Sequence, residues 1–449
     1  MPRFTLLLLA SIVVNFLVGR HIVAVLRARG APDARRWLAL GVVFNLGLLG
    51  YFKYANFFVD NINALLGMDW RVGRILLPIG ISFYSFTQIA FLVDAYEGKV
   101  NEANPVHFGL FVTYFPHLVA GPVLHHAQMM PQFADPSIYR LRADHFVGGL
   151  AIFVLGLFKK VVFADGIAPY ADAVFNPVDG GAIPTFGEAW LGALAYTLQL
   201  YFDFSGYSDM AVGMSWMFNV RLPFNFNSPY QAHNISDFWR RWHISLSNFL
   251  RDYLYIPLGG NRSGAFRRYL NLSITMLLGG LWHGASWSFV CWGGLHGLYL
   301  MAHHGFRAAL GVRARAWLDG SRAWSAAAWT LTLLAVIAAW VFFRAQSLPG
   351  AARMIAAMLP TELAAEPVHA LLWNAGLQSS AGAAWCVVLG AVALFGRNSN
   401  RLGVALMARL AAGQWLRPLL GGAAACAVAM LLLVNIARDS VSAFIYFNF

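Results

Sequence analysis

Apolar runs recur from one end of this 449-residue chain to the other, and they constrain its fold more than any other feature. A helix needs about 20 apolar residues to cross the hydrocarbon core of a bilayer. Several of the runs are shorter than this or rich in glycine, so we expect re-entrant or broken helices among them. The runs cover residues 4–26, 37–58, 75–93, 106–124, 146–163, 189–217, 270–281, 287–301, 324–343, 381–395 and 419–436.

The composition supports a membrane protein. Hydrophobic residues make up 59% of the chain and charged residues only 12%, whereas soluble domains carry about 25% charged residues. We therefore predict an all-α polytopic membrane protein with about 10–12 transmembrane or re-entrant helices. No internal repeat is visible, so one integral membrane domain over residues 1–449 is the simplest organisation. Its motif-bearing core covers about 77–300, and alanine- and leucine-rich packing helices cover about 324–449.

The formal net charge of +12 comes from arginines that lie between apolar runs. Basic loops on the cytoplasmic side and anionic lipid account for such a pattern without nucleic acid. A basic cytoplasmic mouth that attracts a phosphate-bearing donor is the second explanation. Arg3 precedes the first apolar run, no small-x-small cleavage site follows it, and further arginines come next, so we expect an uncleaved first span with its N-terminus outside.

Residues 234–255 contain the first candidate site. Apolar residues recur there at three- and four-residue spacing, which predicts one amphipathic helix at the membrane surface. Asn234 or Ser236 can cap its start. His243 falls on the border between its apolar and polar faces. An interfacial histidine solvated by water would also fit this position. The polar face carries Arg240, Arg241, Asn248, Arg251 and Asp252.

Residues 270–301 contain the second candidate site. Gly279 and Gly280 precede His283, and Gly284 follows it. Small residues permit close helix approach or a break in the helix at membrane depth. His283 is therefore expected to be deeply packed, where desolvation disfavours the charged imidazole and leaves a neutral base. A core histidine bonded to a neighbouring carbonyl is the alternative.

Metal and haem binding are not predicted. No HExxH-like spacing occurs, and Cys291, Cys386 and Cys426 have no paired spacing. His283 and His296 have a separation that can serve two haems, but no second such pair exists among the other histidines. The segment 206–210 lacks the second glycine of a nucleophile elbow.

Seven segments form an ordered set of motifs. They are LPIGISFYSFTQIAFLVDAYEG (77–98), FPHLVAGPVLHHAQMMPQF (115–133), YFDFSGYSDMAVGMSWMFNVRLPFNFNSPY (201–230), DFWRRWHISLSNFLRDYLYIPLGGNR (237–262), GGLWHGASW (279–287), WVFFRA (340–345) and FIYFNF (444–449). Together they resemble the membrane-bound O-acyltransferase (MBOAT) superfamily, and within it the bacterial alginate O-acetyltransferase-like branch. The resemblance is close over about residues 77–300 and thinner beyond.

The resemblance implies a funnel of helices around a central cavity, in a multi-pass protein of the bacterial inner membrane. It implies that an acyl group is transferred to a hydroxyl, with the donor arriving from the cytoplasm and the acceptor from outside. The family's most invariant histidine matches His283, and its second signature histidine matches His243. A separate periplasmic SGNH-type protein and a polysaccharide secretion complex are the implied partners, besides membrane lipid. The chain is short for the alginate enzyme, which leaves the polysaccharide open.

Residue roles follow from this chemistry. Transfer from a thioester to an alcohol needs a base for the hydroxyl proton, donors for the oxyanion and exclusion of water. His283 is predicted to be the base, and His243 to orient the acyl donor or polarise its carbonyl. Acetyl-CoA is the expected donor substrate, with no bound cofactor. The predicted substrate-binding residues are Trp239, Arg240, Arg241, Asn248, Arg251, Tyr255 and Trp282.

Alternative roles remain open for several of these residues. Each arginine also suits a lipid headgroup. The pairs Asp237–Arg241 and Asn248–Asp252, at four-residue spacing, are better explained as helix support than as chemistry.

The expected function is O-acetylation of an exopolysaccharide such as alginate or cellulose. Within the enzyme class, O-acyl transfer to peptidoglycan or D-alanylation of teichoic acid is the alternative. A polysaccharide transporter is a different class; transporters usually show internal repeats. A scaffold within a secretion complex, with incidental histidines, is a third class.

Overall fold

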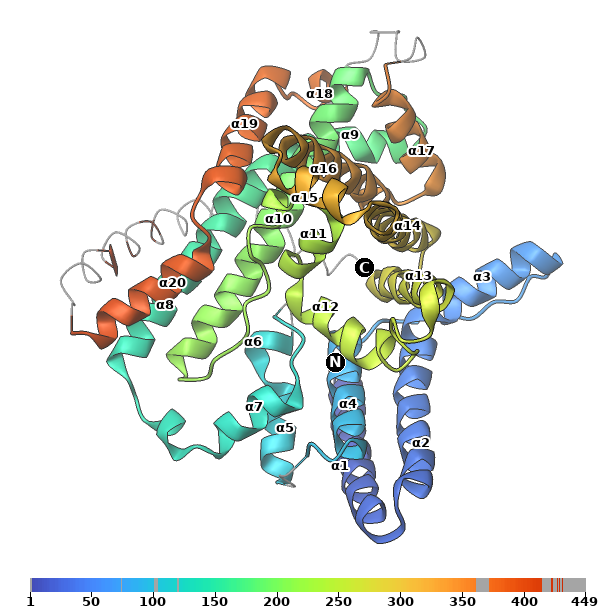
Figure 1. Ribbon diagram of the computed structural model, residues 1–449, viewed down its shortest axis with the longest axis vertical. Helices are drawn as coiled ribbons and strands as arrows, with labels where there is room; N and C mark the ends of the chain where they lie inside the picture. Colours follow the sequence, from blue (N-terminus) through green and yellow to red (C-terminus); the bar gives the residue numbers. More distant parts are fainter. Residues whose placement is uncertain are drawn as a thin grey trace. The chain divides into compact units, whose positions relative to one another are not determined.

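The structure is a computed structural model, and it describes residues 2–73, 75–100, 104–118, 121–360, 371–413, 421–422, 426, 428 and 430 (Figure 1). Secondary structure in this part of the chain is helical, and no strand occurs in it. The predicted motif at 444–449 lies outside the described residues, as does most of the apolar run 419–436. The prediction of an all-α polytopic membrane protein is confirmed.

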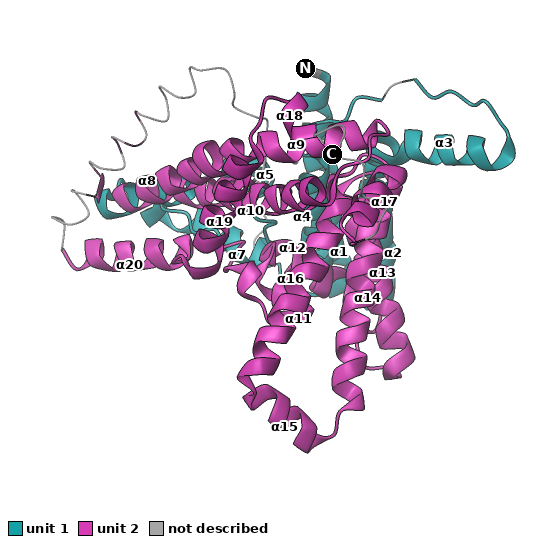
Figure 2. Cartoon of the chain, turned by 90° about the horizontal axis from the view of Figure 1, so that it is seen from above, with its two compact units in different colours: residues 1–146, 214–223 teal, residues 147–213, 224–449 magenta. Residues whose placement is uncertain are grey.

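The chain divides into two compact units (Figure 2). Unit 1 comprises Met1–Phe146 and Met214–Pro223, and unit 2 comprises Val147–Gly213 and Phe224–Phe449. Both candidate histidines belong to unit 2. The single integral domain remains a prediction.

Unit 1 is built around helices that hydrogen-bond to one another through buried polar side chains. Asn15 and Asn45 bond through their amides, at 2.6 and 3.2 Å, and Asn15 also reaches the Gln88 side chain at 2.8 Å. Such bonds join helices where the hydrophobic effect cannot. The elements of this unit are α1 (Pro2–Arg29), α2 (Ala31–Leu49), η1 (Gly50–Tyr54), α3 (Ala55–Leu66), α4 (Ile81–Tyr96), α5 (Pro105–Thr113), α6 (Phe115–Leu118), α7 (His126–Ala134) and η2 (Pro136–Tyr139).

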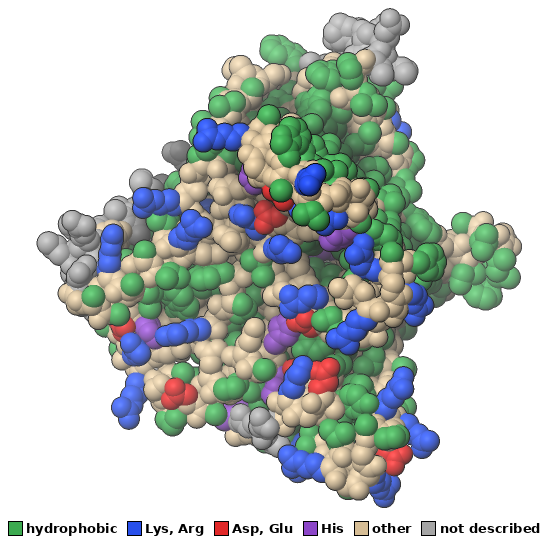
Figure 3. Space-filling view, viewed as in Figure 1, with side chains coloured by type: hydrophobic (Ala, Val, Ile, Leu, Met, Phe, Trp, Pro, Cys, Tyr) green, Lys and Arg blue, Asp and Glu red, His purple; other side chains and the backbone are tan. Residues whose placement is uncertain are grey.

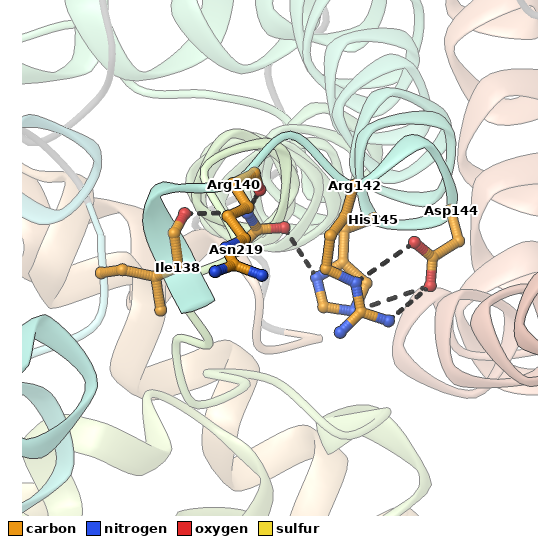
Figure 4. Close-up of polar contacts among 6 residues, drawn as sticks. All are labelled: Ile138, Arg140, Arg142, Asp144, His145 and Asn219. Atoms are coloured by element: carbon orange, nitrogen blue, oxygen red, sulfur yellow. Dashed lines mark hydrogen bonds and ion pairs between the residues drawn. The ribbon is translucent and has the colours of Figure 1, made fainter. Parts of the chain in front are cut away.

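A second polar cluster in unit 1 surrounds Asn219, which has a positive φ of 60° (Figure 4). Its amide nitrogen donates to the carbonyls of Ile138 and Arg140, at 2.8 and 2.6 Å. Its amide oxygen lies 3.0 Å from Nδ1 of His145. These bonds tie residues 138–145 to the turn that holds Asn219, and they give His145 a structural role.

Unit 2 holds the remaining helices. Those that position the candidate site are α11, α12, α13, α14 and α16. The elements are α8 (Ala143–Phe158, which begins in unit 1), η3 (Lys159–Ala164), α9 (Asp165–Asp179), α10 (Phe186–Met217, whose last residues belong to unit 1), η4 (Pro229–Gln231), α11 (Ile235–Arg241), α12 (Ile244–Leu250), η5 (Arg251–Tyr255), α13 (Gly264–His283), α14 (Trp287–Ala309), α15 (Val312–Gly320), α16 (Arg322–Arg344), α17 (Leu348–Ala357), α18 (Leu371–Asn374), α19 (Ser379–Phe395) and α20 (Ser399–Ala411).

Helices α13 and α14 lie side by side and touch through their backbones (Figure 2). A Cβ atom on Gly280 would clash with the carbonyl oxygen of Phe289, and one on Gly293 would clash with the carbonyl oxygen of Met276. Only glycine allows this approach. The predicted close packing around Gly280 is confirmed.

Four helical stretches of the described chain are long and apolar enough to span a membrane: 3–29, 31–66, 143–179 and 322–344. The pair α19 and α20, bent by 54°, makes a fifth if it is counted as one broken span. By this criterion the described residues contain fewer full spans than the predicted 10–12 transmembrane or re-entrant helices. The predicted run 106–124 divides into α5 and the short α6, and the helical part of the run 75–93 begins only at Ile81.

Residues 165–187 lie between two apolar runs and are polar and rich in glycine and proline. This composition predicts a connecting loop, but most of the stretch is helical. Residues Asp165–Asp179 form α9 even though Pro169 and Pro177 lie within it. The reason is a buried apolar face at helical spacing, which outweighs the polar and proline-rich composition. That face comprises Ile167, Ala168, Tyr170, Ala171, Val174, Phe175 and Val178.

Candidate active site

The segment 234–255 is not the single helix that its periodicity predicts. As predicted, Asn234 caps its start by accepting the Asp237 N–H at 2.9 Å. Helix α11 then ends at Arg241, and His243 adopts the left-handed conformation, with φ 43° and ψ 53°. Histidine is among the residues that tolerate this region. Helix α12 starts anew at Ile244, so the prediction of one continuous helix is wrong.

Backbone hydrogen bonds from a distant segment explain the break. The Asn227 N–H donates to the Arg241 carbonyl, and the Ile244 N–H donates to the Asn225 carbonyl, both at 2.9 Å. These bonds engage the carbonyl and amide groups on either side of His243. The stretch 225–227 thus takes the place of the helical bonds that residues 241–244 forgo.

His243 is fully buried rather than at a water-facing border. Its Nδ1 lies 3.2 Å from Oδ1 of Asn225. The same Oδ1 accepts the Ser245 backbone N–H at 3.1 Å and the Ser245 hydroxyl at 2.9 Å. Because a backbone N–H only donates, this atom is the amide oxygen, so Nδ1 of His243 carries the proton.

The other ring nitrogen of His243 is therefore a hydrogen-bond acceptor. Among the described residues, none lies within hydrogen-bonding distance of Nε2. Burial lowers the pKa of His243 to about 3, so the ring is neutral at physiological pH. Its Nε2 lone pair is available to a donor group on a ligand.

His283 is the last residue of α13, as the flanking glycines predicted. The chain continues in an extended conformation at Gly284, and α14 begins at Trp287. The imidazole lies among aromatic rings, with centroids of Trp282 and Trp292 at 5.0 Å and of Phe343 at 5.2 Å. Only 4% of the residue is exposed. These walls keep bulk water away from the ring.

The two histidines, 40 residues apart in sequence, meet in unit 2. Their ring centroids are 6.5 Å apart. Trp282 packs beside both, with its ring 6.3 Å from His243 and 5.0 Å from His283. This distance leaves both imidazoles within reach of one small reacting group.

A third histidine, to which the sequence analysis gave no role, belongs to the same cluster. His296 on α14 is fully buried, and in the described structure neither of its ring nitrogens has a hydrogen-bond partner. Its ring lies 4.9 Å from that of Trp292 and 5.1 Å from that of Trp239. A sequence signal existed, because Phe289, Trp292, His296 and Tyr299 form an aromatic stripe at helical spacing.

The predicted substrate-binding residues fall into two groups. Trp239 and Trp282 contact the histidine cluster through their rings. Arg240 is exposed, and its charge acts on both His303 and His304.

Two of the remaining predicted substrate-binding residues, Arg241 and Arg251, are each paired with a carboxylate. Arg241 bonds Asp237 at 2.9 Å, which is the helix support expected of that pair. Arg251 bonds Asp252 at 2.7 Å, so this carboxylate is held by the adjacent arginine. Asn248 lies on α12, and Arg251 and Tyr255 lie on η5.

Basic side chains are more frequent than acidic ones on the molecular face that Figure 3 shows, in keeping with the net charge of +12. In the described chain, no group of three or more His, Cys, Asp or Glu side chains is arranged to bind a metal ion. The polar groups of the cluster are imidazoles and indoles in an aromatic setting.

Comparison with known families identifies the superfamily to which the chain belongs. The model of the MBOAT, membrane-bound O-acyltransferase family, matches residues 74–343, which include all three histidines. The chain belongs to this family. The resemblance seen in its motifs is thereby confirmed, and so is its class as an O-acyltransferase.

Individual relatives show which MBOAT proteins it is similar to. It is 49% identical over 354 residues to a probable alginate O-acetylase of Azotobacter vinelandii, covering 78% of this chain and 67% of the relative. It is 43% identical over 389 residues to a peptidoglycan O-acetyltransferase of Helicobacter pylori, covering 80% and 70%. A teichoic acid D-alanyltransferase of Bacillus subtilis is 26% identical over 279 residues, covering 59% and 66%. The matches thus span about two thirds of each relative.

Proposed function

We propose that this protein transfers an acetyl group from acetyl-CoA to a hydroxyl acceptor for O-acetylation of an exopolysaccharide such as alginate or cellulose. The observation that carries the proposal is the meeting of His243 and His283, 6.5 Å apart, inside aromatic walls. The names of relatives that are 43–49% identical, the alginate O-acetylase and the peptidoglycan O-acetyltransferase, support polysaccharide O-acetylation.

In this mechanism His283 is the general base. It takes the proton of the acceptor hydroxyl as the oxygen attacks the thioester carbonyl carbon, forming a tetrahedral intermediate. The C–S bond then breaks, and the imidazolium returns the proton to the leaving thiolate. The products are an acetyl ester and a free thiol. The rings of Trp292 and Phe343 around His283 limit hydrolysis of the donor by water.

His243 acts beside this base by orienting a substrate. Its Nε2 is an acceptor in the neutral tautomer that Asn225 selects, so it suits an O–H or N–H group of a substrate. Polarising a carbonyl would require a proton on Nε2, which burial of the ring opposes. Of the two roles predicted for His243, orientation is therefore the better supported.

The exposed Arg240 is suited to meet the phosphates of the donor or an anionic lipid headgroup. The protein would act as a multi-pass enzyme of the inner membrane, with a periplasmic SGNH-type partner that passes the acetyl group to a polymer.

The test is ester analysis of the exopolysaccharide from cells that carry the parent chain, His283→Gln or no chain. We expect His283→Gln to lower acetylation by about 10²–10⁴-fold at an unchanged level of protein in the membrane. His21→Gln, which changes an exposed histidine of α1, is the matched control and should retain acetylation. Retained acetylation in His283→Gln would contradict the assignment of the base.

The same cells separate the alternatives. The 43% identical peptidoglycan O-acetyltransferase favours peptidoglycan as the second candidate acceptor, and acetylated muropeptides that disappear in His283→Gln would establish it. D-alanine esters on teichoic acid would indicate the third acyl acceptor. If the purified parent protein with acceptor shows no turnover of acetyl-CoA, a transporter or scaffold becomes the better explanation.

A further inference from the structure

A cavity of about 450 Å³ lies between α14 and α16 in unit 2. Its walls are mostly apolar and aromatic, with Tyr299 and Phe306 from α14 and Trp324 from α16. Asn234 and Ile235, at the start of α11, also line it. Apolar cavities with a few polar groups are the usual form of small-molecule sites.

His296 does not line this cavity, but it packs against a residue of the cavity wall. Tyr299, in the cavity wall, has its ring 5.8 Å from that of His296. Phe238 follows the lining residue Ile235 by one turn of α11, and its ring lies 6.0 Å from that of His296 at an interplanar angle of 9°. Both α14 and α11 therefore place an aromatic ring against His296 within one helical turn of a residue that lines the cavity.

His296 has hydrogen-bonding capacity that the described protein leaves unused. Both of its ring nitrogens, and the indole nitrogens of Trp239 and Trp292 beside it, lack a partner within the described residues. Burying such groups unsatisfied costs free energy, so a native protein normally retains them for a ligand or water. A neutral imidazole offers one donor and one acceptor, and each indole offers a donor. An amide matches this set.

Positive charge lies beside the same cavity. His303 lines it, and the charges of Arg240 and Arg307 act on His303. Arg307 is neutralised by Asp319, through bonds of 2.7 and 3.0 Å. Arg240 is exposed, and its charge also acts on His304. An anionic group such as a phosphate would be stabilised there.

His296 is linked to the proposed base, His283, through the ring of Trp292. The Trp292 ring lies 4.9 Å from His296 and 5.0 Å from His283. A chain that starts at Arg240 and His303 and passes His296 would bring its far end to His283. A ligand along these residues would place a phosphate, an amide and the reacting carbonyl in that order.

We propose that His296, with the indoles of Trp239 and Trp292, binds an amide in the arm of the acyl donor, and that the cavity between α14 and α16 receives that arm. The ligand class is a thioester whose arm carries amide groups and whose distant end carries phosphate. This inference rests on the proposed function, because it assigns the donor to the site of His283.

His296→Phe is the variant that separates binding from packing. It keeps a ring against Phe238 and Trp292 and removes both nitrogens. If His296 only packs, this variant should fold at least as well as the parent and be equally active. If His296 binds the donor, thermal stability is retained, KM for acetyl-CoA and Kd for coenzyme A each rise about 10-fold, and kcat changes little. His296→Gln should recover part of the affinity because it keeps a donor and an acceptor.

A donor without amides provides the control. With phenyl thioacetate, parent and His296→Phe should have equal kcat/KM, because the missing contact does not exist for this donor. His21→Phe, the same chemical change at an exposed position, should match the parent with both donors.

Two outcomes overturn the inference: unchanged KM and Kd in His296→Phe, or an equal loss with both donors. Coenzyme A binding is measured without turnover. A failure of acetyl transfer in the parent, with tight coenzyme A binding that His296→Phe weakens, would therefore reject the proposed function and keep this site.

Discussion

Two regions of unit 2 bury polar groups in opposite ways. In the lysine cluster, Lys160 bonds Asp165 at 2.6 Å and Asp203 at 2.7 Å, and Lys159 bonds Asp209 at 2.8 Å. Each buried ammonium there has a carboxylate partner. In the histidine cluster of His243, His283 and His296, by contrast, Nε2 of His243 and both ring nitrogens of His296 have no hydrogen-bond partner within the described chain.

The difference separates structure from function. Paired buried charges are consistent with a cluster that holds η3, α9 and α10 together, because each charge is compensated within the protein. Unsatisfied neutral groups gain their compensation only when something binds. A buried charged residue in a membrane protein usually indicates a functional site. In this protein, buried groups without hydrogen-bond partners indicate the functional site better than buried charges do.

The largest effect on stability is expected from Lys160→Met. The change leaves Asp165 and Asp203 buried without the ammonium that bridges them. Breaking a buried pair in this way costs about 3–5 kcal/mol. Thermal or denaturant unfolding of the purified protein in detergent should show the loss.

Arg307→Met is the matched control, because it breaks an exposed pair with Asp319 and should leave stability essentially unchanged. The comparison fails if Lys160→Met folds normally but loses acetyl transfer. In that case the lysine cluster, too, would belong to the catalytic machinery.

An intermediate effect is expected at Asn225, which positions His243. Asn225→Ala removes the acceptor that keeps the proton on Nδ1, and kcat should fall about 10–100-fold, as it does when the partner that orients a functional histidine is removed elsewhere. Ser245→Ala removes only another donor to the same oxygen and should have a much smaller effect. Equal losses of kcat in the two variants would indicate that both disturb the packing around His243, and that the Asn225 hydrogen bond to Nδ1 has no special role.

Asn225→Asp tests the tautomer through pH. Burial keeps the pKa of His243 near 3, so protonation of this ring does not limit the parent above about pH 4. A carboxylate beside Nδ1 favours the imidazolium and raises this pKa. Acceptance at Nε2 is lost once the ring is protonated, so kcat should begin to fall at a higher pH in Asn225→Asp than in the parent. An unshifted acidic limb would argue against a role for Nε2.

The sequence predicted the parts that depend on local composition. Long apolar runs dictate helices in a membrane whatever their partners, and the glycines around His283 permit close helix packing or a break in the helix. Both predictions are confirmed.

The break between α11 and α12 at His243 could not be predicted from the local sequence. The apolar spacing across 234–255 satisfies one helix, and the break depends on backbone bonds from 225–227. Periodicity within a window contains no information about such partners. Likewise, nothing in the local sequence distinguishes Asn225 from other loop asparagines, and its role is seen only from its contact with His243 in the fold. Helix α9 shows the opposite case, since polar residues and prolines hid an apolar face that tertiary packing uses.

The smallest expected effect on stability comes from two adjacent glycines of α14, Gly293 and Gly294. Gly293→Ala would force a Cβ against the Met276 carbonyl of α13 and move the helices apart, whereas Gly294→Ala meets only a Leu277 methyl carbon at 3.6 Å. We expect a loss of about 1–2 kcal/mol for the first and no loss, or a gain of up to about 1 kcal/mol, for the second.

Activity distinguishes the histidine cluster from ordinary packing in this pair. Because α13 ends at His283 and α14 carries His296, separation of the helices displaces the base from its aromatic walls, and a displacement of about 1 Å can cost about 10²-fold in rate. Gly293→Ala should therefore lose far more acetyl transfer, measured per folded molecule, than its unfolding free energy alone implies. If its activity falls only in proportion to the folded fraction, the glycine contact serves stability, and the precise placement of His283 matters less than its presence.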